Sequence, residues 1–278
     1  MSLKNKIINL INIFKEKKYI PVVEIKNKSD LLKDKVALIT GGSSGIGYAI
    51  AENFIKHGCN VIIAGRNEKK LKRCCDELNK IGNCKYIVLD VLDINKLDNK
   101  ILEASTFFDK NKIDILVNSA GIVAKSSFED MKEDEYDSIM DINTKGTFFM
   151  CQYMSKYMIE HNIKGHILNI SSSSALRPAW TAYEMSKWAI KGFTLGLADK
   201  LLPYGIIVNA IAPGPTATPM LGKKKDDTIY NLNSISRRYA VPLEIANMAL
   251  FLVSESGNMI VGDTIYMTGG SGLISLHH

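Results

Sequence analysis

The sequence lacks the features of membrane, metal-binding and nucleic-acid-binding proteins. No stretch of its 278 residues approaches the roughly 20 consecutive apolar residues that a membrane-spanning helix needs. The five cysteines form no C-x-x-C pair, and no H-E-x-x-H pattern occurs. The lysine-rich runs are not interleaved with aromatic residues, as a nucleic-acid surface would require. We therefore expect reduced thiols, no metal, no membrane span and no nucleic-acid partner.

Residues 1–33 form a predicted N-terminal extension. Within it, Lys4 to Phe14 superficially resembles a signal peptide. However, Asn9 and Asn12 interrupt its apolar stretch, and the charged run Lys15 to Lys18 stands where a small-residue cleavage site would follow. We therefore expect a cytoplasmic protein. The apolar residues of this stretch fit one face of a short helix, which either packs on protein or lies on a membrane surface.

From about residue 34, short apolar runs alternate with helical patterns in a chain that is 46% hydrophobic. The runs span 35–40, 60–64, 85–89, 113–117, 166–170, 206–210 and 264–267. The helical patterns span 47–57, 68–80, 93–108, 132–160, 182–202 and 243–253. This alternation predicts one α/β domain over 34–278, a Rossmann-like, doubly wound parallel sheet with helices on both faces. The Pro-, Gly- and Lys-containing segment 216–238 predicts a substrate loop.

A glycine-rich turn follows the first predicted strand. Residues 40–47 read T-G-G-S-S-G-I-G and lead directly into a helix. Glycine at 41, 45 and 47 allows a tight turn and lets a pyrophosphate approach the helix N-terminus, where free N–H groups and the dipole favour an anion. A purely structural turn is the alternative, but the position after a strand favours a dinucleotide site.

The end of the second predicted strand bears on the choice of cofactor. An acidic residue there would accept hydrogen bonds from the ribose 2′-hydroxyl of NAD, whereas arginine suits the 2′-phosphate of NADP. This strand ends with Gly65 and Arg66 and carries no carboxylate. The guanidinium of Arg66 is a fork-shaped phosphate donor, which Ser43 or Asn67 could assist. We therefore expect NADP(H), unless Arg66 only faces solvent.

A set of motifs in one order resembles the short-chain dehydrogenase/reductase family. The motifs are T-G-x-x-x-G-x-G at 40–47, Asn118-Ser119-Ala120-Gly121 with serine replacing the usual second asparagine, Asn143, Asn169 to Ser172, Tyr183-x-x-x-Lys187, and Asn209 to Gly214 followed by Thr218. The resemblance covers about residue 34 to the C-terminus and includes 3-oxoacyl reductase-like members. It implies an oxidoreductase that moves a hydride between a nicotinamide and a carbonyl or alcohol carbon.

The resemblance also implies the site residues. The catalytic set is Asn143, Ser172, Tyr183 and Lys187, with Asn143 helping to hold a proton-relay water. Because four serines adjoin, Ser171 and Ser173 are alternatives to Ser172. The implied cofactor-binding residues are Gly41, Ser43, Ser44, Gly45, Ile46, Gly47, Arg66, Asp90, Val91, Asn118, Ala120, Gly121, Tyr183, Lys187, Pro213, Gly214, Thr216 and Thr218.

The residue types fit this chemistry. Hydride transfer to a ketone needs a proton donor for the forming alkoxide. The Tyr183 phenol has a reference pKa of about 10, and the ammonium of Lys187, one helical turn later, is expected to lower that pKa. Ser172 would hold the carbonyl oxygen by a second hydrogen bond.

The predicted function is NADP(H)-dependent reduction of a small carbonyl substrate, or the reverse, by a homodimer or homotetramer. A 3-oxoacyl thioester is the first substrate candidate by resemblance. The alternative is a sensor or scaffold that binds NADP(H) without turnover, since a fold does not fix a function. The complete catalytic set favours the enzyme. Trp180 either stacks on the substrate or covers core.

Overall fold

The central feature of the fold is a seven-stranded parallel sheet with strand order β3-β2-β1-β4-β5-β6-β7. The structure is a computed structural model that describes residues 30–223, 227, 229–231 and 234–272. The strands are β1 Val36–Thr40, β2 Asn60–Gly65, β3 Cys84–Val88, β4 Ile115–Asn118, β5 His166–Ile170, β6 Ile207–Pro213 and β7 Thr264–Met267. The chain order reverses direction beside β1, which makes the sheet doubly wound.

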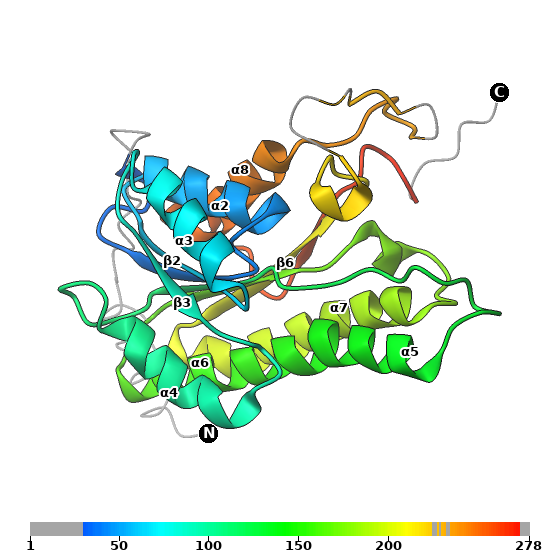
Figure 1. Cartoon of the computed structure of the whole chain (residues 1–278). Helices are drawn as coiled ribbons and strands as arrows, with labels where there is room; N and C mark the ends of the chain where they lie inside the picture. Colours follow the sequence, from blue (N-terminus) through cyan, green and yellow to red (C-terminus); the bar gives the residue numbers. More distant parts are fainter. Residues whose placement is uncertain (1–29, 224–226, 228, 232–233, 273–278) are drawn as a thin grey trace, which may run out of the picture.

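Helices cover both faces of the sheet (Figure 1). On one face lie α2 Gly45–Lys56, α3 Glu68–Leu78 and α8 Pro242–Val253. On the other lie α4 Ile94–Ser105, α5 Glu133–Met140, α6 Thr147–Glu160 and α7 Ala182–Leu201. The predicted fold class, a single Rossmann-like α/β sheet, is confirmed.

The central strand β1 is a nearly continuous apolar run because it is buried from both sides. In β1, Ala37 and Ile39 face the core beneath α2 and α8, whereas Val36 and Leu38 face the core beneath α4 and α6. All four side chains are at most 1% exposed. Such a buried strand makes the centre of the sheet rigid, so the residues at the end of the strand are held in fixed positions.

The long predicted helix over 132–160 is interrupted by a π-helical turn. The turn, η2, spans Asp141–Gly146 and joins α5 to α6 without a break in the helical path. A π-turn holds one extra residue relative to α winding, and such turns are frequent at functional sites. The predicted catalytic residue Asn143 lies inside it.

The described chain begins close to the sheet. Leu32 is 1% exposed, and its N–H donates to the carbonyl oxygen of His57 at 2.9 Å. Residues 30–33, which the sequence analysis places in the extension, therefore pack on the domain. The rest of the extension, 1–29, lies outside the described residues.

The predicted substrate loop over 216–238 is only partly described. It contains the short 3-10 helix η5 Pro219–Leu221, and a bridge joins Thr216 to Ala240. Positions 224–226, 228 and 232–233 lie outside the described residues. Among the helices that the structure describes, none is long and apolar enough to cross a membrane.

The cysteine thiols are free. Cys74 donates to the carbonyl oxygen of Ser43 and Cys75 to that of Cys84, so the two adjacent thiols point to different neighbours. In the described part of the chain, no group of three or more His, Cys, Asp or Glu side chains could hold a metal ion.

Candidate active site

The glycine-rich turn lies at the carboxyl end of β1, where β1 meets β4. Gly41 has a φ of +68°, and a Cβ on it would lie 2.8 Å from the backbone nitrogen of Ala120. A Cβ on Gly47 would lie 2.6 Å from the carbonyl oxygen of Gly41. Real Cβ atoms do not approach backbone so closely, so the turn requires glycine at both positions.

The N-terminus of α2 opens from this turn without a side-chain cap. Ser44 occupies the N-cap position in an extended conformation but makes no side-chain capping hydrogen bond, and the first turn carries no acidic residue. The N–H groups and the positive end of the helix dipole are thus available to an anion. Gly45, with a φ of +55°, faces Thr218, whose side chain would lie 3.5 Å from a Cβ there.

Thr40 links the glycine-rich turn to the segment that follows β4, a role that the sequence alone did not reveal. Its hydroxyl accepts hydrogen bonds from the N–H groups of Ser119 and Ala120 at 3.2 and 3.3 Å. Thr40 is 2% exposed, so this link is internal. The signal was present in the sequence as the threonine that precedes Gly41, but its partners become evident only from the β1–β4 pairing.

A cavity of about 330 Å³ lies beside the turn, over the carboxyl ends of β1, β2 and β4. The predicted cofactor residues that line it are Gly41, Ser43, Arg66, Asp90, Val91, Ala120 and Gly121. The structure therefore brings together residues that are up to 80 positions apart in the chain. A crevice at this place in a doubly wound sheet is where such folds bind ligands.

The same cavity holds a second cation that the sequence analysis did not single out. Lys70 lines it together with Arg66. Lys70 lies in the first turn of α3, and its N–H donates to the Oδ1 atom of the N-cap residue Asn67 at 2.9 Å. Asn67 lines the cavity as well, although its Oδ1 atom is used as the cap. Lys70 could have been found from its spacing, one helical turn after Arg66.

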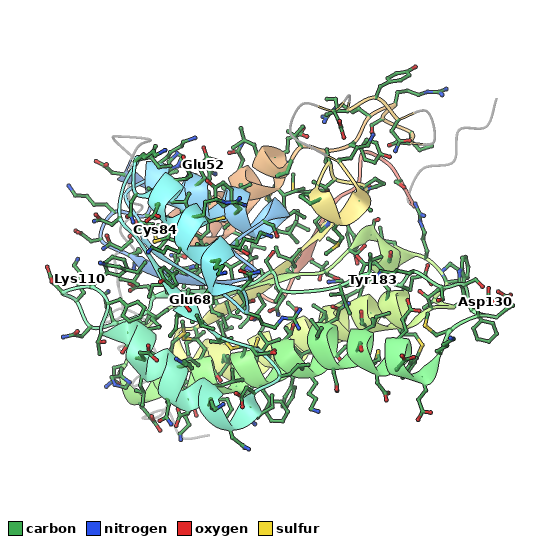
Figure 2. The ribbon with its side chains drawn as sticks, in the orientation of Figure 1. Glu52, Glu68, Cys84, Lys110, Asp130 and Tyr183 are labelled. Carbon is green, nitrogen blue, oxygen red and sulfur yellow. The ribbon has the colours of Figure 1, made fainter. Side chains whose placement is uncertain are left out.

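Tyr183, which is labelled in Figure 2, and Lys187 lie in the first two turns of α7. Thr181 and Glu184 start this helix with a capping box, in which the Glu184 carboxylate accepts the Thr181 N–H at 3.0 Å. The Lys187 Nζ atom lies 5.6 Å from the centre of the Tyr183 ring and donates to the carbonyl oxygen of Ile170 at 2.9 Å. The helix thus aligns both side chains with the end of β5.

Among the adjacent serines, Ser172 is the one whose side chain forms a hydrogen bond with Tyr183. Its Oγ atom also accepts the N–H of Ser174 at 3.1 Å. The Ser171 hydroxyl instead donates to the carbonyl oxygen of Lys187 at 3.1 Å and is directed to the helix backbone. Ser173 lies in the 3-10 turn η3 Ser173–Leu176. The geometry favours Ser172 over its neighbours.

Asn143 joins the same group from the π-turn. Its Oδ1 atom accepts the Ile122 N–H at 2.9 Å, and its Nδ2 atom donates to the Ile122 carbonyl oxygen at 2.9 Å. A Cβ on Gly121 would lie 3.1 Å from Asn143 Oδ1 and 3.8 Å from Lys187 Nζ. Gly121 therefore lies between the cavity and the side chains of Asn143 and Lys187.

Burial shifts the proton equilibria of the two α7 side chains. It lowers the pKa of Lys187 to about 8. Burial raises the pKa of Tyr183. The hydrogen bond with Ser172 opposes this rise, and the charge of Glu184 adds to it. The net pKa of Tyr183 is therefore raised, opposite to the lowering expected from the nearby Lys187, because loss of solvent disfavours the phenolate more strongly than the hydrogen bond with Ser172 favours it.

Several other predicted residues lie apart from the cavity. Asn118 is 4% exposed, and its Nδ2 atom donates to Asn169 Oδ1 at 3.0 Å and to the Cys151 sulfur at 3.1 Å. Its side chain is thus directed into the core and not into the cavity. Gly214 packs against Thr268 at the end of β6, and the Thr216 hydroxyl donates to the Gly214 carbonyl oxygen at 2.9 Å.

Trp180 precedes α7 and is 59% exposed. It therefore does not cover core, which removes one of the two interpretations of this residue. Its N–H donates to the Glu184 carboxylate at 3.0 Å, so its backbone is fixed by the start of the helix. The side chain remains available at the surface, three residues before Tyr183 in the chain.

Comparison with known proteins agrees with the motifs. The family model for short chain dehydrogenase matches residues 35–229. The oxidoreductase UcpA of Salmonella typhimurium is 36% identical over 256 residues, which cover 87% of this chain and 96% of that protein. The 3-oxoacyl-[acyl-carrier-protein] reductase FabG of Rickettsia felis is 37% identical over 245 residues, covering 86% and 97% respectively.

Solved structures show the same likeness. The 3-oxoacyl-[acyl-carrier protein] reductase of Brucella melitensis superposes with a TM-score of 0.78 at 32% identity, covering 92% of this chain and 99% of that one. A short chain dehydrogenase of Burkholderia cenocepacia in complex with NADP gives a TM-score of 0.76 at 28% identity, covering 87% and 98%. Sequence motifs, sheet order and these matches agree: the chain is an oxidoreductase of the short chain dehydrogenase family.

Proposed function

We propose that the protein reduces a ketone to an alcohol with NADPH, or carries out the reverse reaction with NADP. The observation that carries this proposal is the junction at Gly121. This residue lines the cavity beside the glycine-rich turn, and it also approaches Asn143 and Lys187. A dinucleotide that extends along the cavity would bring its nicotinamide end to the side chains of α7.

The residues present fit such a cofactor. The uncapped N-terminus of α2 suits a pyrophosphate, and Asp90 and Val91 suit the adenine side. Arg66 and Lys70 place two cations in the cavity, where a 2′-phosphate would need them, and no carboxylate ends β2. The relative solved in complex with NADP supports this preference.

When bound, NADPH supplies the hydride that the carbonyl carbon accepts. The chain supplies the proton. Tyr183 donates its phenolic hydrogen to the carbonyl oxygen as negative charge develops there, and Ser172 donates a second hydrogen bond to the same oxygen. The Lys187 ammonium stabilises the phenolate left on Tyr183, which then regains a proton from water in the site held by Asn143.

The substrate class follows from relatives rather than from geometry. Several proteins similar to this chain are named 3-oxoacyl-[acyl-carrier-protein] reductases, so a 3-oxoacyl thioester is our first candidate. We further propose a cytoplasmic homodimer or homotetramer in which residues 34–278 form the catalytic domain, with a substrate loop over 216–238. Residues 1–33 would form an extension whose last four residues pack on that domain.

The test is consumption of NADPH over a panel of acetoacetyl thioesters, diketones, sugars and steroids, followed by the loss of nicotinamide absorbance. We expect turnover with a ketone that is faster with NADPH than with NADH. Tight binding of NADPH without consumption of any compound would favour the sensor or scaffold function instead. Equal rates with the two cofactors would overturn the proposed preference.

A further inference from the structure

Helix α7 carries two buried hydroxyls that make the same pair of hydrogen bonds. The Ser186 hydroxyl donates to the carbonyl oxygen of Tyr183 at 2.6 Å and accepts from Asn143 Nδ2 at 3.1 Å. The Thr194 hydroxyl donates to the carbonyl oxygen of Ile190 at 2.8 Å and accepts from Asn169 Nδ2 at 3.0 Å. Ser186 and Thr194 are both 0% exposed. Only the first of these links leads to the candidate active site.

The Ser186 link fixes the orientation of the Asn143 amide. Both hydrogens of the Asn143 amide are used, one by the Ile122 carbonyl oxygen and one by Ser186. The Oδ1 atom accepts one hydrogen bond, from the Ile122 N–H, which leaves it a second lone pair. That oxygen lies toward Gly121, on the side of Lys187. Ser186 thus joins the π-turn to the helix that carries Tyr183 and Lys187.

We propose that Ser186 is a positioning residue that holds the Asn143 amide against α7, so that Asn143 and the π-turn keep their place beside Lys187. This inference rests on the proposed function, because it concerns the delivery of protons to Tyr183. Without the Ser186 hydroxyl, one N–H of a 1%-exposed amide has no acceptor. A buried unsatisfied donor is costly, so the amide or the π-turn would shift to relieve it.

The experiment compares Ser186→Ala with Thr194→Val in the full chain, using NADPH and the best ketone of the panel. Both changes remove one buried hydroxyl of α7 and the acceptor for one asparagine amide. For Ser186→Ala we expect kcat to fall roughly tenfold, the effect of about one hydrogen bond, with KM for NADPH unchanged. For Thr194→Val we expect a similar loss of stability and an unchanged kcat.

A second pair of variants separates positioning from general damage. In an Asn143→Ala background, the further change Ser186→Ala should leave kcat unaltered, because Ser186 acts through Asn143. A further loss of kcat when Ser186→Ala is added to Asn143→Ala would overturn the proposal. Equal losses of kcat in Ser186→Ala and Thr194→Val would overturn it as well.

Hydrogen exchange gives a readout that does not depend on turnover. If the wild type consumes no NADPH, the proposed function fails, and the inference about Ser186 is judged by the side-chain amide of Asn143. We expect its hydrogens to be protected in the wild type and to exchange faster in Ser186→Ala, but not in Thr194→Val. Unchanged protection in Ser186→Ala would show that Ser186 does not hold the amide.

Discussion

In this parallel sheet the amino ends of the strands form one edge, the amino edge, and their carboxyl ends form the other, the carboxyl edge. The two edges differ in how their polar groups are satisfied. At the amino edge, the Asp114 carboxylate accepts the Val36 N–H at 2.9 Å and the Lys112 ammonium at 2.6 Å. At the carboxyl edge, the N-terminus of α2 has no side-chain cap, and burial disfavours the charged forms of Tyr183 and Lys187. Figure 2 shows Lys110, which lies in the loop before β4, at one end of the molecule and Tyr183 well away from it.

The comparison shows how one rigid sheet can serve stability and function at the same time. Groups at the amino edge are satisfied within the protein, so they stabilise the fold. Groups at the carboxyl edge are held in settings that are unfavourable for the isolated chain and become favourable with a ligand or reacting group. Changes at the carboxyl edge should therefore alter turnover, whereas changes at the amino edge should alter stability.

The largest expected effect is that of Tyr183→Phe at the carboxyl edge. Removal of the proton donor should lower kcat by about 10³-fold, within the range of general acid catalysis. The free energy of unfolding should change by no more than about 1 kcal/mol, because only one hydroxyl is lost. Steady-state rates with NADPH and urea unfolding measure the two quantities.

Tyr157→Phe is the matched control at the amino edge. The Tyr157 hydroxyl donates to the Asn111 carbonyl oxygen at 3.4 Å, and the side chain is 3% exposed. We expect a small loss of stability and no change in kcat. A comparable loss of turnover in both variants would contradict the division between the edges.

The next effect is a loss of stability in acid that arises at the amino edge. Burial lowers the pKa of His166 to about 4, with the charge of Lys35 acting in the same direction and Asn258 and Asp114 opposing it. The unfolded histidine, with a pKa of about 6.5, binds a proton first, so stability falls as pH drops from about 6.5 to 4. Over this window the contribution is on the order of 3 kcal/mol.

Urea unfolding of the wild type and of His166→Asn at several pH values tests this contribution. The excess in free energy of unfolding of the wild type over His166→Asn should shrink by about 3 kcal/mol from pH 6.5 to pH 4. A constant difference would show that His166 does not carry the acid sensitivity. In either case kcat near pH 7 should match between the two proteins, since His166 begins β5 whereas Lys187 contacts Ile170 at the other end of that strand.

The smallest of these effects concerns cofactor choice at the carboxyl edge. Arg66→Ala should raise KM for NADPH by about tenfold or more, the effect of losing a charged hydrogen-bonding partner, and should leave KM for NADH nearly unchanged. The control is Lys69→Ala, an exposed neighbouring cation that does not line the cavity. An equal rise in both variants would indicate only a long-range effect of charge.

The sequence predicts the fold, the glycine-rich turn and the pairing of Tyr183 with Lys187, because all three depend on local patterns. Apolar runs and glycine spacing are enough to locate the strands and the turn, and the spacing of Tyr183 and Lys187 places them on one helix face. The role of Ser186 could not be predicted, because its partner Asn143 lies 43 positions away. The pKa of Tyr183 depends on burial, which follows only from the packing of distant segments.

The π-turn at Asp141–Gly146 lets the helix hold one residue more than α winding would, without changing the direction in which α6 faces. Each residue of an α-helix rotates the chain by about 100°, so the extra residue, if it were wound as α-helix, would rotate everything beyond it. The core-facing residues Met150, Met154 and Met158 of α6, each 0% exposed, would then leave the core together. The wider turn absorbs this rotation, so Asn143 is placed at the site while α6 keeps its packing against the sheet.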